Sequence, residues 1–262
     1  DFSGKKYSTI HSNDAAFFDE INASVQYEPS SVFSPEINGQ MASIGIKKGQ
    51  PFEPDERMQK ILSDGAAMGN AAARAILFSP RNENVFFYPG KRRWYSPLAG
   101  GSHEFLNNGE LVQDDRTMML YFATGITPSM VLPKVGTGSV YEITTRDNTG
   151  TYLDGGKNYK LTLPGPVPVN NFWSFIINDI QTRSILETDQ KSGGIDSNAE
   201  GLVLNEDQGA TLYFGPTPPE GHEKNWVQTM PGKGYTVLLR LYGPLQAWYD
   251  KTWMPGDVEP LK

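Results

Sequence analysis

The sequence predicts a mainly β-sheet protein, a sandwich or barrel that follows a helical section. The chain has 262 residues, of which 38% are hydrophobic, and this is enough to bury a core. Two patterns indicate the class. Apolar residues recur with a helical period in the first third of the chain, and short strand-like segments separated by turn residues fill the chain from Val135 onward.

The first third is predicted to be helical. A short helix should cover residues 13–25, where an Asn-Asp pair can cap the first turn, and a second should follow the Ser-Pro-Glu of residues 34–36. The strongest pattern predicts a helix over residues 55–77. Its apolar stripe contains small residues, which indicates close packing against another backbone. One more helix is expected over residues 114–123.

The remainder is predicted to be β. Short β segments are expected at residues 85–88 and 94–95. The Gly/Asn/Asp-rich link over residues 191–201 suits a connection between two sheets. The other strand candidates, each bounded by turn residues, are residues 139–145, 159–163, 172–178, 183–187, 210–214 and 235–242.

The composition excludes several classes of function. The net charge is −7 and the longest basic run is Lys91-Arg92-Arg93, which argues against nucleic acid as a partner, although a local arginine cluster can bind acidic polymers. The chain has no cysteine, so disulfides, thiolate nucleophiles and Cys-ligated zinc are excluded. No apolar run reaches the roughly 18 residues of a membrane span. Neither a nucleophile elbow nor a phosphate- or dinucleotide-binding motif is present.

A series of short motifs follows residue 150 in a fixed order. They are Tyr152-Leu153-Asp154-Gly155, Asn158-Tyr159-Lys160-Leu161, Phe172-Trp173-Ser174, Asp179-Ile180-Gln181-Thr182-Arg183-Ser184, Thr188-Asp189-Gln190, Leu212-Tyr213-Phe214-Gly215-Pro216, Asn225-Trp226-Val227-Gln228-Thr229, Pro231-Gly232-Lys233-Gly234, Leu239-Arg240-Leu241-Tyr242-Gly243-Pro244-Leu245, Trp253 and Pro255-Gly256-Asp257. Together they resemble the domain-of-unknown-function 1214 family, over about residues 150–257.

The resemblance implies a jelly-roll-like antiparallel β-sandwich at residues 85–262, after a helical section at residues 1–84. It also implies an N-terminal neighbour, the domain-of-unknown-function 1254, lost by cleavage or truncation. Members are common in bacteria, often exported, and occur in large DNA viruses, so an exported, envelope or virion location is expected. The family brings no catalytic residues. Asn178 and Ile180 depart from its pattern, where an aromatic residue and a proline are common.

Aromatic residues are candidates for binding sugar rings, because they make up 11% of the chain. Trp94, Tyr95 and Trp248 lie beside charged or turn residues and are expected to be exposed, and Tyr121 is a further candidate for substrate binding. The alternative is that these rings fill the core of the sandwich.

Polar residues with the right chemistry are available for a catalytic site. A glycoside hydrolase needs two carboxyl groups about 5 to 9.5 Å apart. A lyase on uronic-acid polymers needs a cation for the substrate carboxylate, a base and an acid. These residues also have structural alternatives, namely a turn-forming role for Asp179, an internal salt bridge for Arg240 and an ordinary surface-loop position for His103. The catalytic candidates are Asp179, Arg183, Arg240, Tyr242, His103 and Glu104.

The leading hypothesis is a glycoside hydrolase or polysaccharide lyase that degrades a cell-wall or envelope polysaccharide. The alternative is a non-catalytic carbohydrate-binding or assembly module of an envelope or virion protein, which can form homo-oligomers. No cofactor is expected. A structural calcium site would have to use hard oxygen ligands whose spacing matches no known calcium loop: Asp196, Asn198, Glu200, Asn205, Glu206 and Asp207.

Overall fold

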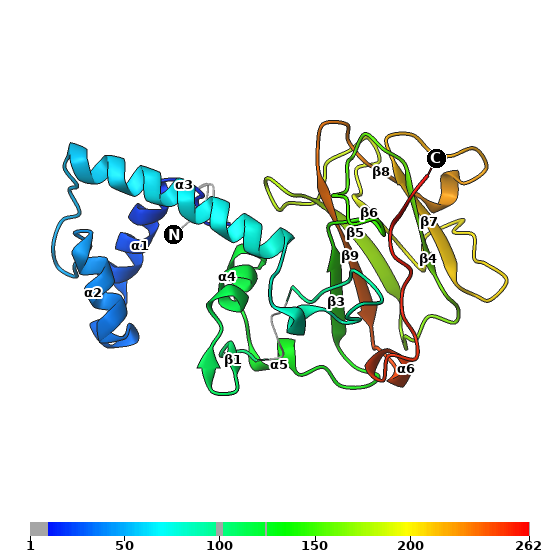
Figure 1. Cartoon of the computed structure of the whole chain (residues 1–262), viewed down its shortest axis with the longest axis horizontal. Helices are drawn as coiled ribbons and strands as arrows, with labels where there is room; N and C mark the ends of the chain where they lie inside the picture. Colours follow the sequence, from blue (N-terminus) through cyan, green and yellow to red (C-terminus); the bar gives the residue numbers. More distant parts are fainter. Residues whose placement is uncertain (1–9, 98–101, 124, 262) are drawn as a thin grey trace. The chain divides into compact units, whose positions relative to one another are not determined.

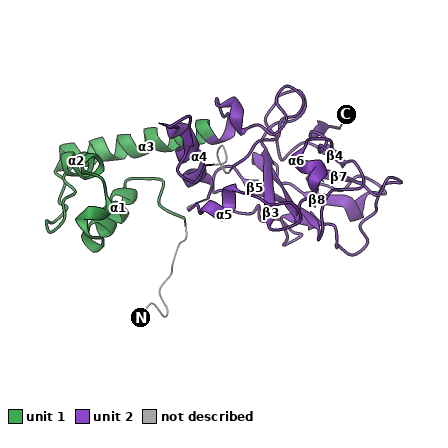
Figure 2. Cartoon of the chain, turned by 90° about the horizontal axis from the view of Figure 1, so that it is seen from below, with its two compact units in different colours: residues 1–76 green, residues 77–262 purple. Residues whose placement is uncertain are grey.

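The computed structural model describes residues 10–97, 102–123 and 125–261. The chain divides into two compact units, residues 1–76 and residues 77–262 (Figure 2). Among the described helices, none combines the length and the apolar composition that crossing a membrane demands.

Unit 1 is helical, as predicted. Ser34 Oγ accepts a hydrogen bond from the Ile37 amide at 3.3 Å, and Asp55 Oδ1 accepts one from the Met58 amide at 2.7 Å. These side chains satisfy amide groups that have no partner in a first helical turn, which explains where two of the helices begin. The elements of unit 1 are α1 (Ala16–Tyr27), η1 (Ser30–Val32), α2 (Pro35–Ser43) and most of α3 (Glu56–Phe78) (Figure 1).

The close packing expected for the small residues of α3 is wrong for the described part of the chain. A Cβ atom added at Gly65 or Gly69 would meet nothing within 4 Å, and Met68 is 73% exposed. Leu62, by contrast, is buried. The packing of α3 therefore depends on a few large side chains, and the small residues between them lie at an open helix surface.

Unit 2 contains two four-stranded sheets (Figure 1). The first has the order β10-β4-β7-β8, with β4 (Tyr159–Leu163), β7 (Ala210–Gly215), β8 (Trp226–Gln228) and β10 (Glu259–Pro260). The second has the order β3-β9-β5-β6, with β3 (Ser139–Thr144), β5 (Trp173–Asp179), β6 (Gly194–Asp196) and β9 (Tyr235–Tyr242). Neighbouring strands are antiparallel except for β7 and β8, which are parallel.

Shorter elements complete unit 2. They are η2 (Glu83–Val85), the paired strands β1 (Leu106–Asn107) and β2 (Glu110–Leu111), α4 (Gln113–Phe122), α5 (Pro128–Val131), η4 (Glu223–Asn225) and α6 (Gln246–Tyr249). The predicted helix over residues 114–123 is thus present as α4.

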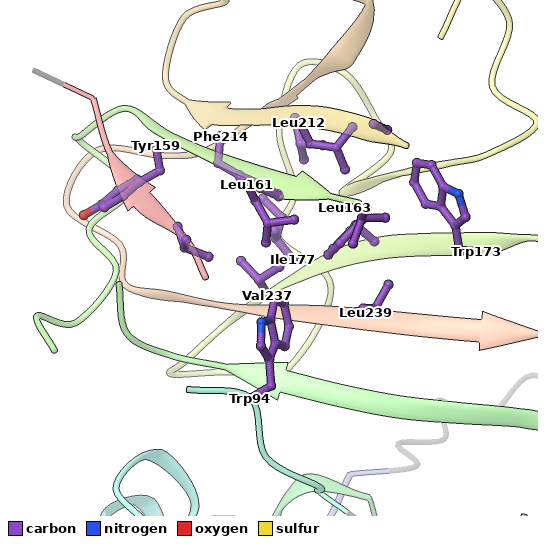
Figure 3. Close-up of a cluster of buried hydrophobic side chains, with 14 of the residues drawn as sticks. Trp94, Tyr159, Leu161, Leu163, Trp173, Ile177, Leu212, Phe214, Val237 and Leu239 are labelled. Carbon is purple, nitrogen blue, oxygen red and sulfur yellow. The ribbon is translucent and has the colours of Figure 1, made fainter. Parts of the chain in front are cut away.

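The two sheets share one hydrophobic core (Figure 3). Alternate residues of each strand point into it, as the two-residue period of a strand requires. Leu161 and Leu212 contribute from the first sheet, and Ile177, Val237 and Leu239 from the second. The opposite face of β9 is also largely buried, since Leu238 is 7% exposed. The prediction that this strand is covered on both faces is confirmed.

Several predicted strands do not form. Residues 183–187 are irregular because Arg183 has a φ of 65°, outside the extended region, and Ile185 makes only an isolated bridge to Asn178. Residues 85–88 and 94–95 likewise give isolated bridges, through Phe86 and Tyr95. The short strands β6, β8 and β10 were not predicted. Two or three residues are too few to show a period.

Candidate functional site

A cavity of about 600 Å³ is present in unit 2. One wall is the irregular segment of residues 78–95, and the other is the end of β3 with the turn that follows it. Asp257, near the C-terminus, completes the lining. Two smaller cavities, of about 160 and 190 Å³, lie elsewhere in this unit. The largest of the three has the volume typical of a small-molecule site.

Backbone hydrogen bonds fix the segment of residues 78–95 against the sheet. Tyr95 and Ile143 exchange both backbone hydrogen bonds, at 3.0 and 2.9 Å, which adds this residue to the edge of β3. The Tyr95 hydroxyl donates to the Leu77 carbonyl at 2.8 Å. The indole nitrogen of Trp94 donates to the Gly256 carbonyl at 2.9 Å. These contacts hold the Trp94 end of the loop that contains the run Lys91-Arg92-Arg93.

Arginine side chains dominate the polar lining of the cavity. Arg92 Nε donates to the Pro255 carbonyl at 3.0 Å. Arg146 donates to the Gly150 carbonyl at 3.1 Å, to Ser79 Oγ at 3.1 Å and to the Tyr152 hydroxyl at 2.7 Å. All of these acceptors are neutral. These neutral acceptors therefore orient the two guanidinium groups, and neither forms a salt bridge among the described residues.

The cavity also contains carboxyl groups. Asp257 Oδ1 accepts the Arg93 amide at 2.9 Å. Burial raises the pKa of Asp257, and the charges of Arg92 and Arg93 oppose that rise. Glu83, at the start of η2, is exposed and lines the same cavity. Cationic and acidic groups are thus both available to a ligand.

The structure does not bring the predicted catalytic residues together. Asp179 forms an ion pair with Lys233 at 2.6 Å and accepts the Gln181 amide at 2.6 Å, so it forms the turn that sequence offered as the alternative. Lys233 and the turn amides lower the pKa of Asp179, although burial opposes them. Arg183 donates to the Tyr121 carbonyl at 2.8 Å and lies 4.2 Å from the ring centre. Both polar groups have internal partners.

The second predicted pair lies elsewhere on the same sheet. Arg240 is opposite Ser174 in the β5–β9 register, whereas Asp179 is opposite Tyr235, five residues along β9. The Arg240 guanidinium lies 4.9 Å from the Tyr141 ring and 5.9 Å from the Tyr242 ring. The salt bridge considered for Arg240 is wrong, because within the described chain it has no carboxylate partner and packs on aromatic rings instead.

Of the remaining predicted residues, two are exposed and the aromatic ones are buried. His103 and Glu104 are exposed in a turn before β1. The expectation of exposed aromatic platforms is wrong, because Trp94, Tyr95 and Trp248 are 0%, 2% and 5% exposed. Tyr121 is also buried, at 6%. Of these four aromatic residues, Tyr95 is the one that lines the cavity.

A buried carboxyl group, Glu142, escaped the sequence analysis. It is 0% exposed on β3, and Oε1 accepts hydrogen bonds from the Tyr88 hydroxyl at 2.8 Å and the Trp248 indole at 2.5 Å. Oε2 has no partner among the described residues. Burial raises the pKa of Glu142 to about 7. Lys251 Nζ lies 4.1 Å from the centre of the Trp248 ring and partly offsets that burial.

In the described residues, no group of three or more His, Asp or Glu side chains is placed to hold a metal ion. Asp196, one of the calcium candidates, accepts the Asn198 amide at 2.8 Å within a turn. Asp207 accepts the Gly165 and Gly209 amides at 2.8 and 2.9 Å. These carboxylates stabilise loop backbones.

The sheet region matches a known family. Residues 138–246, from the start of β3 to the start of α6, match the family described as "Protein of unknown function (DUF1214)". The chain carries a DUF1214 domain. The cavity therefore combines Arg146 and its neighbours, inside the DUF1214 domain, with residues 78–95 and Asp257, outside it. The pairing with a domain-of-unknown-function 1254 stays a prediction.

Two solved structures are similar over 94% of this chain. The VPA0106 protein from Vibrio parahaemolyticus is 16% identical with a TM-score of 0.47, and 55% of that protein is covered. An uncharacterized protein from Burkholderia cenocepacia is 17% identical with a TM-score of 0.37, and 50% is covered. The chain thus spans about half the length of these two proteins. No curated protein matches it.

Proposed function

We propose that this protein binds a polysaccharide of a cell wall or envelope, and that one saccharide unit occupies the cavity beside β3. The observation that carries the proposal is a cavity of about 600 Å³ with Arg92, Arg93 and Arg146 in its lining. Sugar hydroxyls are hydrogen-bond acceptors as well as donors, and guanidinium groups offer several donors in a fixed plane. Backbone carbonyls orient all three of these arginines before any ligand arrives.

Binding is better supported than a degradation reaction that uses the predicted catalytic residues Asp179 and Arg183. Asp179 is neutralised by Lys233, and Arg183 is engaged by Tyr121. Hydrolysis requires two carboxyl groups facing one bond, and these side chains do not provide them. The non-catalytic module is therefore the main proposal.

Degradation is retained as a second candidate because of Asp257 and Glu83. Both line the cavity, and burial raises the pKa of Asp257. A carboxyl group with a raised pKa is the better suited of two carboxyl groups to act as the general acid, with the second as base or nucleophile. In this second candidate function, Asp257 protonates the leaving oxygen, and Glu83 acts as base or nucleophile on the opposite side of the sugar ring.

Affinity electrophoresis and product analysis test the two candidates together. The protein should be retarded in gels that contain pectin or polygalacturonate, and Arg92→Ala should restore most of its mobility. Unretarded migration in every polysaccharide tested would overturn the binding proposal. New reducing ends, or the ultraviolet absorbance of unsaturated ends, would support degradation. If products form, Asp257→Asn should abolish them and leave retardation in place.

We also propose that the two sheets are wound as a jelly roll and that the protein works at a cell envelope or in a virion as a homo-oligomer. The core shared by two four-stranded sheets supports a jelly roll. The parallel pairing of β7 with β8 departs from the antiparallel pairing expected for that fold. Light scattering of the purified chain tests the oligomer: a monomer at all concentrations would overturn it.

A further inference from the structure

The turn after β3 is built to hold its backbone in place. Asp147 Oδ1 accepts hydrogen bonds from the Thr149 amide at 2.9 Å, from Thr149 Oγ1 at 2.6 Å and from the Thr151 amide at 3.0 Å. The Asn148 amide donates to the Val258 carbonyl at 2.8 Å, which ties the turn to the C-terminal segment. Its carbonyl groups therefore have fixed directions.

Two cationic side chains bind to this same turn. Arg146 NH1 donates to the Gly150 carbonyl at 3.1 Å, and Arg93 NH2 donates to the Asn148 carbonyl at 3.4 Å. The two residues are 53 positions apart in sequence, yet their guanidinium groups meet carbonyls two residues apart. Each guanidinium has five N–H donors, and these contacts use only part of them.

Gly150 allows the close approach of Arg93. It has a φ of 90°, and a Cβ atom at this position would lie 3.3 Å from Arg93 NH2. The guanidinium plane thus lies against a turn without side-chain bulk. A larger residue here would strain the backbone and push the cation away.

The local charge differs in sign from the charge of the whole protein. The cavity lining contains four cationic residues and two acidic ones, a formal balance of 4 − 2 = +2, on a chain of net charge −7. The four ion pairs of the described residues involve none of the four cations. They are Lys91, Arg92, Arg93 and Arg146.

We propose that the ligand carries anionic oxygens, and that Arg93 and Arg146, positioned by the Asp147–Thr151 turn, bind one such group. This inference rests on the proposed polysaccharide-binding function and specifies its substrate class: an acidic glycan. Guanidinium groups bind carboxylate and sulfate oxygens through paired, charge-assisted hydrogen bonds, which neutral sugars cannot provide. Cations that form no salt bridge among the described residues can pair with an anion that enters this cavity.

Calorimetric titration with an oligogalacturonate and with its methyl ester tests whether binding requires the acidic group, because the two ligands share one sugar backbone. We expect the acid form to bind about tenfold more tightly, and its affinity to fall as salt screens the charges. Dextran sulfate and dextran form the second pair, and they distinguish sulfate from carboxylate as the source of the anion. Equal affinity for acidic and neutral forms would overturn this inference and leave the proposed function intact. Binding to none of the four would overturn both.

Substitutions test whether Arg93 and Arg146 bind the anionic group. Arg146→Ala should weaken acid binding at least tenfold, and Arg93→Lys, which keeps the charge but loses the planar donors, should weaken it several-fold. Arg57→Ala is the matched control, because it removes one exposed arginine charge from unit 1. Thermal melts establish that each variant is folded. Undiminished preference for the acid in both cavity variants would overturn the assignment of Arg93 and Arg146.

Discussion

The turn at Asp179 and the cavity at Arg146 both hold charged side chains, but the two regions use them differently. Asp179 is 5% exposed and has an ion-pair partner, Lys233, as well as two turn amides. Arg146 donates to carbonyl and hydroxyl oxygens and packs 4.1 Å from the centre of the Tyr152 ring, and it forms no salt bridge among the described residues. A charge with an internal counter-ion stabilises the fold, whereas an oriented charge without one remains available to a ligand. Changes at the two places should therefore separate stability from binding.

Glu142 is a buried carboxyl group that has no ion-pair partner within the described chain. Its removal should have the largest effect on the free energy of unfolding. Glu142→Ala should lower the free energy of unfolding by about 3 kcal/mol, because it leaves a cavity and two buried donors, from Tyr88 and Trp248, without an acceptor. Denaturant titration measures the change. Glu187→Ala, at an exposed position, is the control.

The pH dependence of stability checks the same residue. The pKa of Glu142 is raised to about 7 in the folded protein, above the roughly 4.3 of an unfolded chain. A raised carboxyl pKa means that ionisation disfavours folding, so its contribution should decline as pH rises from about 4.5 to 7. Glu142→Gln should flatten this part of the curve. A slope identical to the wild type would contradict the burial argument.

At the turn, Asp179→Ala should lower the free energy of unfolding by about 2 kcal/mol, since the Gln181 and Thr182 amides and Lys233 lose their acceptor. Polysaccharide binding should not change. Denaturant titration and affinity electrophoresis of the same preparation measure both quantities. Asp189→Ala, an exposed aspartate, should alter neither. Lost binding in a stable Asp179→Ala protein would show that this turn is part of a site.

At the cavity, Gly150→Ala should weaken acid-glycan binding about fivefold by displacing Arg93, at a loss of about 1 kcal/mol in stability from its positive φ. Gly109→Ala is a matched control, because Gly109 has a φ of 85° and open space around it among the described residues. Calorimetric titration separates the two effects. If both variants bind the glycan equally well, the close approach of Arg93 has no role in recognition.

The smallest effect is expected for the partner of Asp179. Lys233→Met should cost about 0.5 kcal/mol at neutral pH, because the lysine side chain is 38% exposed and solvent screens the pair. The pKa of Asp179 is lowered, so the pair stabilises the fold above the unfolded pKa and loses that effect as pH falls through the folded pKa. The stabilities of the variant and the wild type should therefore converge as pH falls through the lowered pKa of Asp179. A gap that persists in acid would exclude the ion pair as its cause.

Local sequence patterns predict the class of the fold and most of its elements. Strand period predicted the observed bounds of β4 and β9, and the Ser34-Pro35-Glu36 signal located the start of α2, because these signals are local. The predicted cap at Asn13-Asp14 was less accurate, since α1 begins at Ala16 with Ala15 at its N-cap. The sequence also singled out Lys91-Arg92-Arg93 as the longest basic run and Asp179 as a turn former. Local patterns failed where the backbone is unusual, as at Arg183, or where an element has only two or three residues, as in β8 and β10.

Which side chains meet depends on long-range packing that local patterns do not encode. Arg93 and Arg146 converge because the segment of residues 78–95 adds to the edge of β3 through Tyr95, a long-range pairing without a local signal. The same pairing buries Trp94 and Tyr95, so rings expected at the surface became part of the core. Burial and partner choice depend on residues far apart in the chain, and hence the site could not be read from spacing alone.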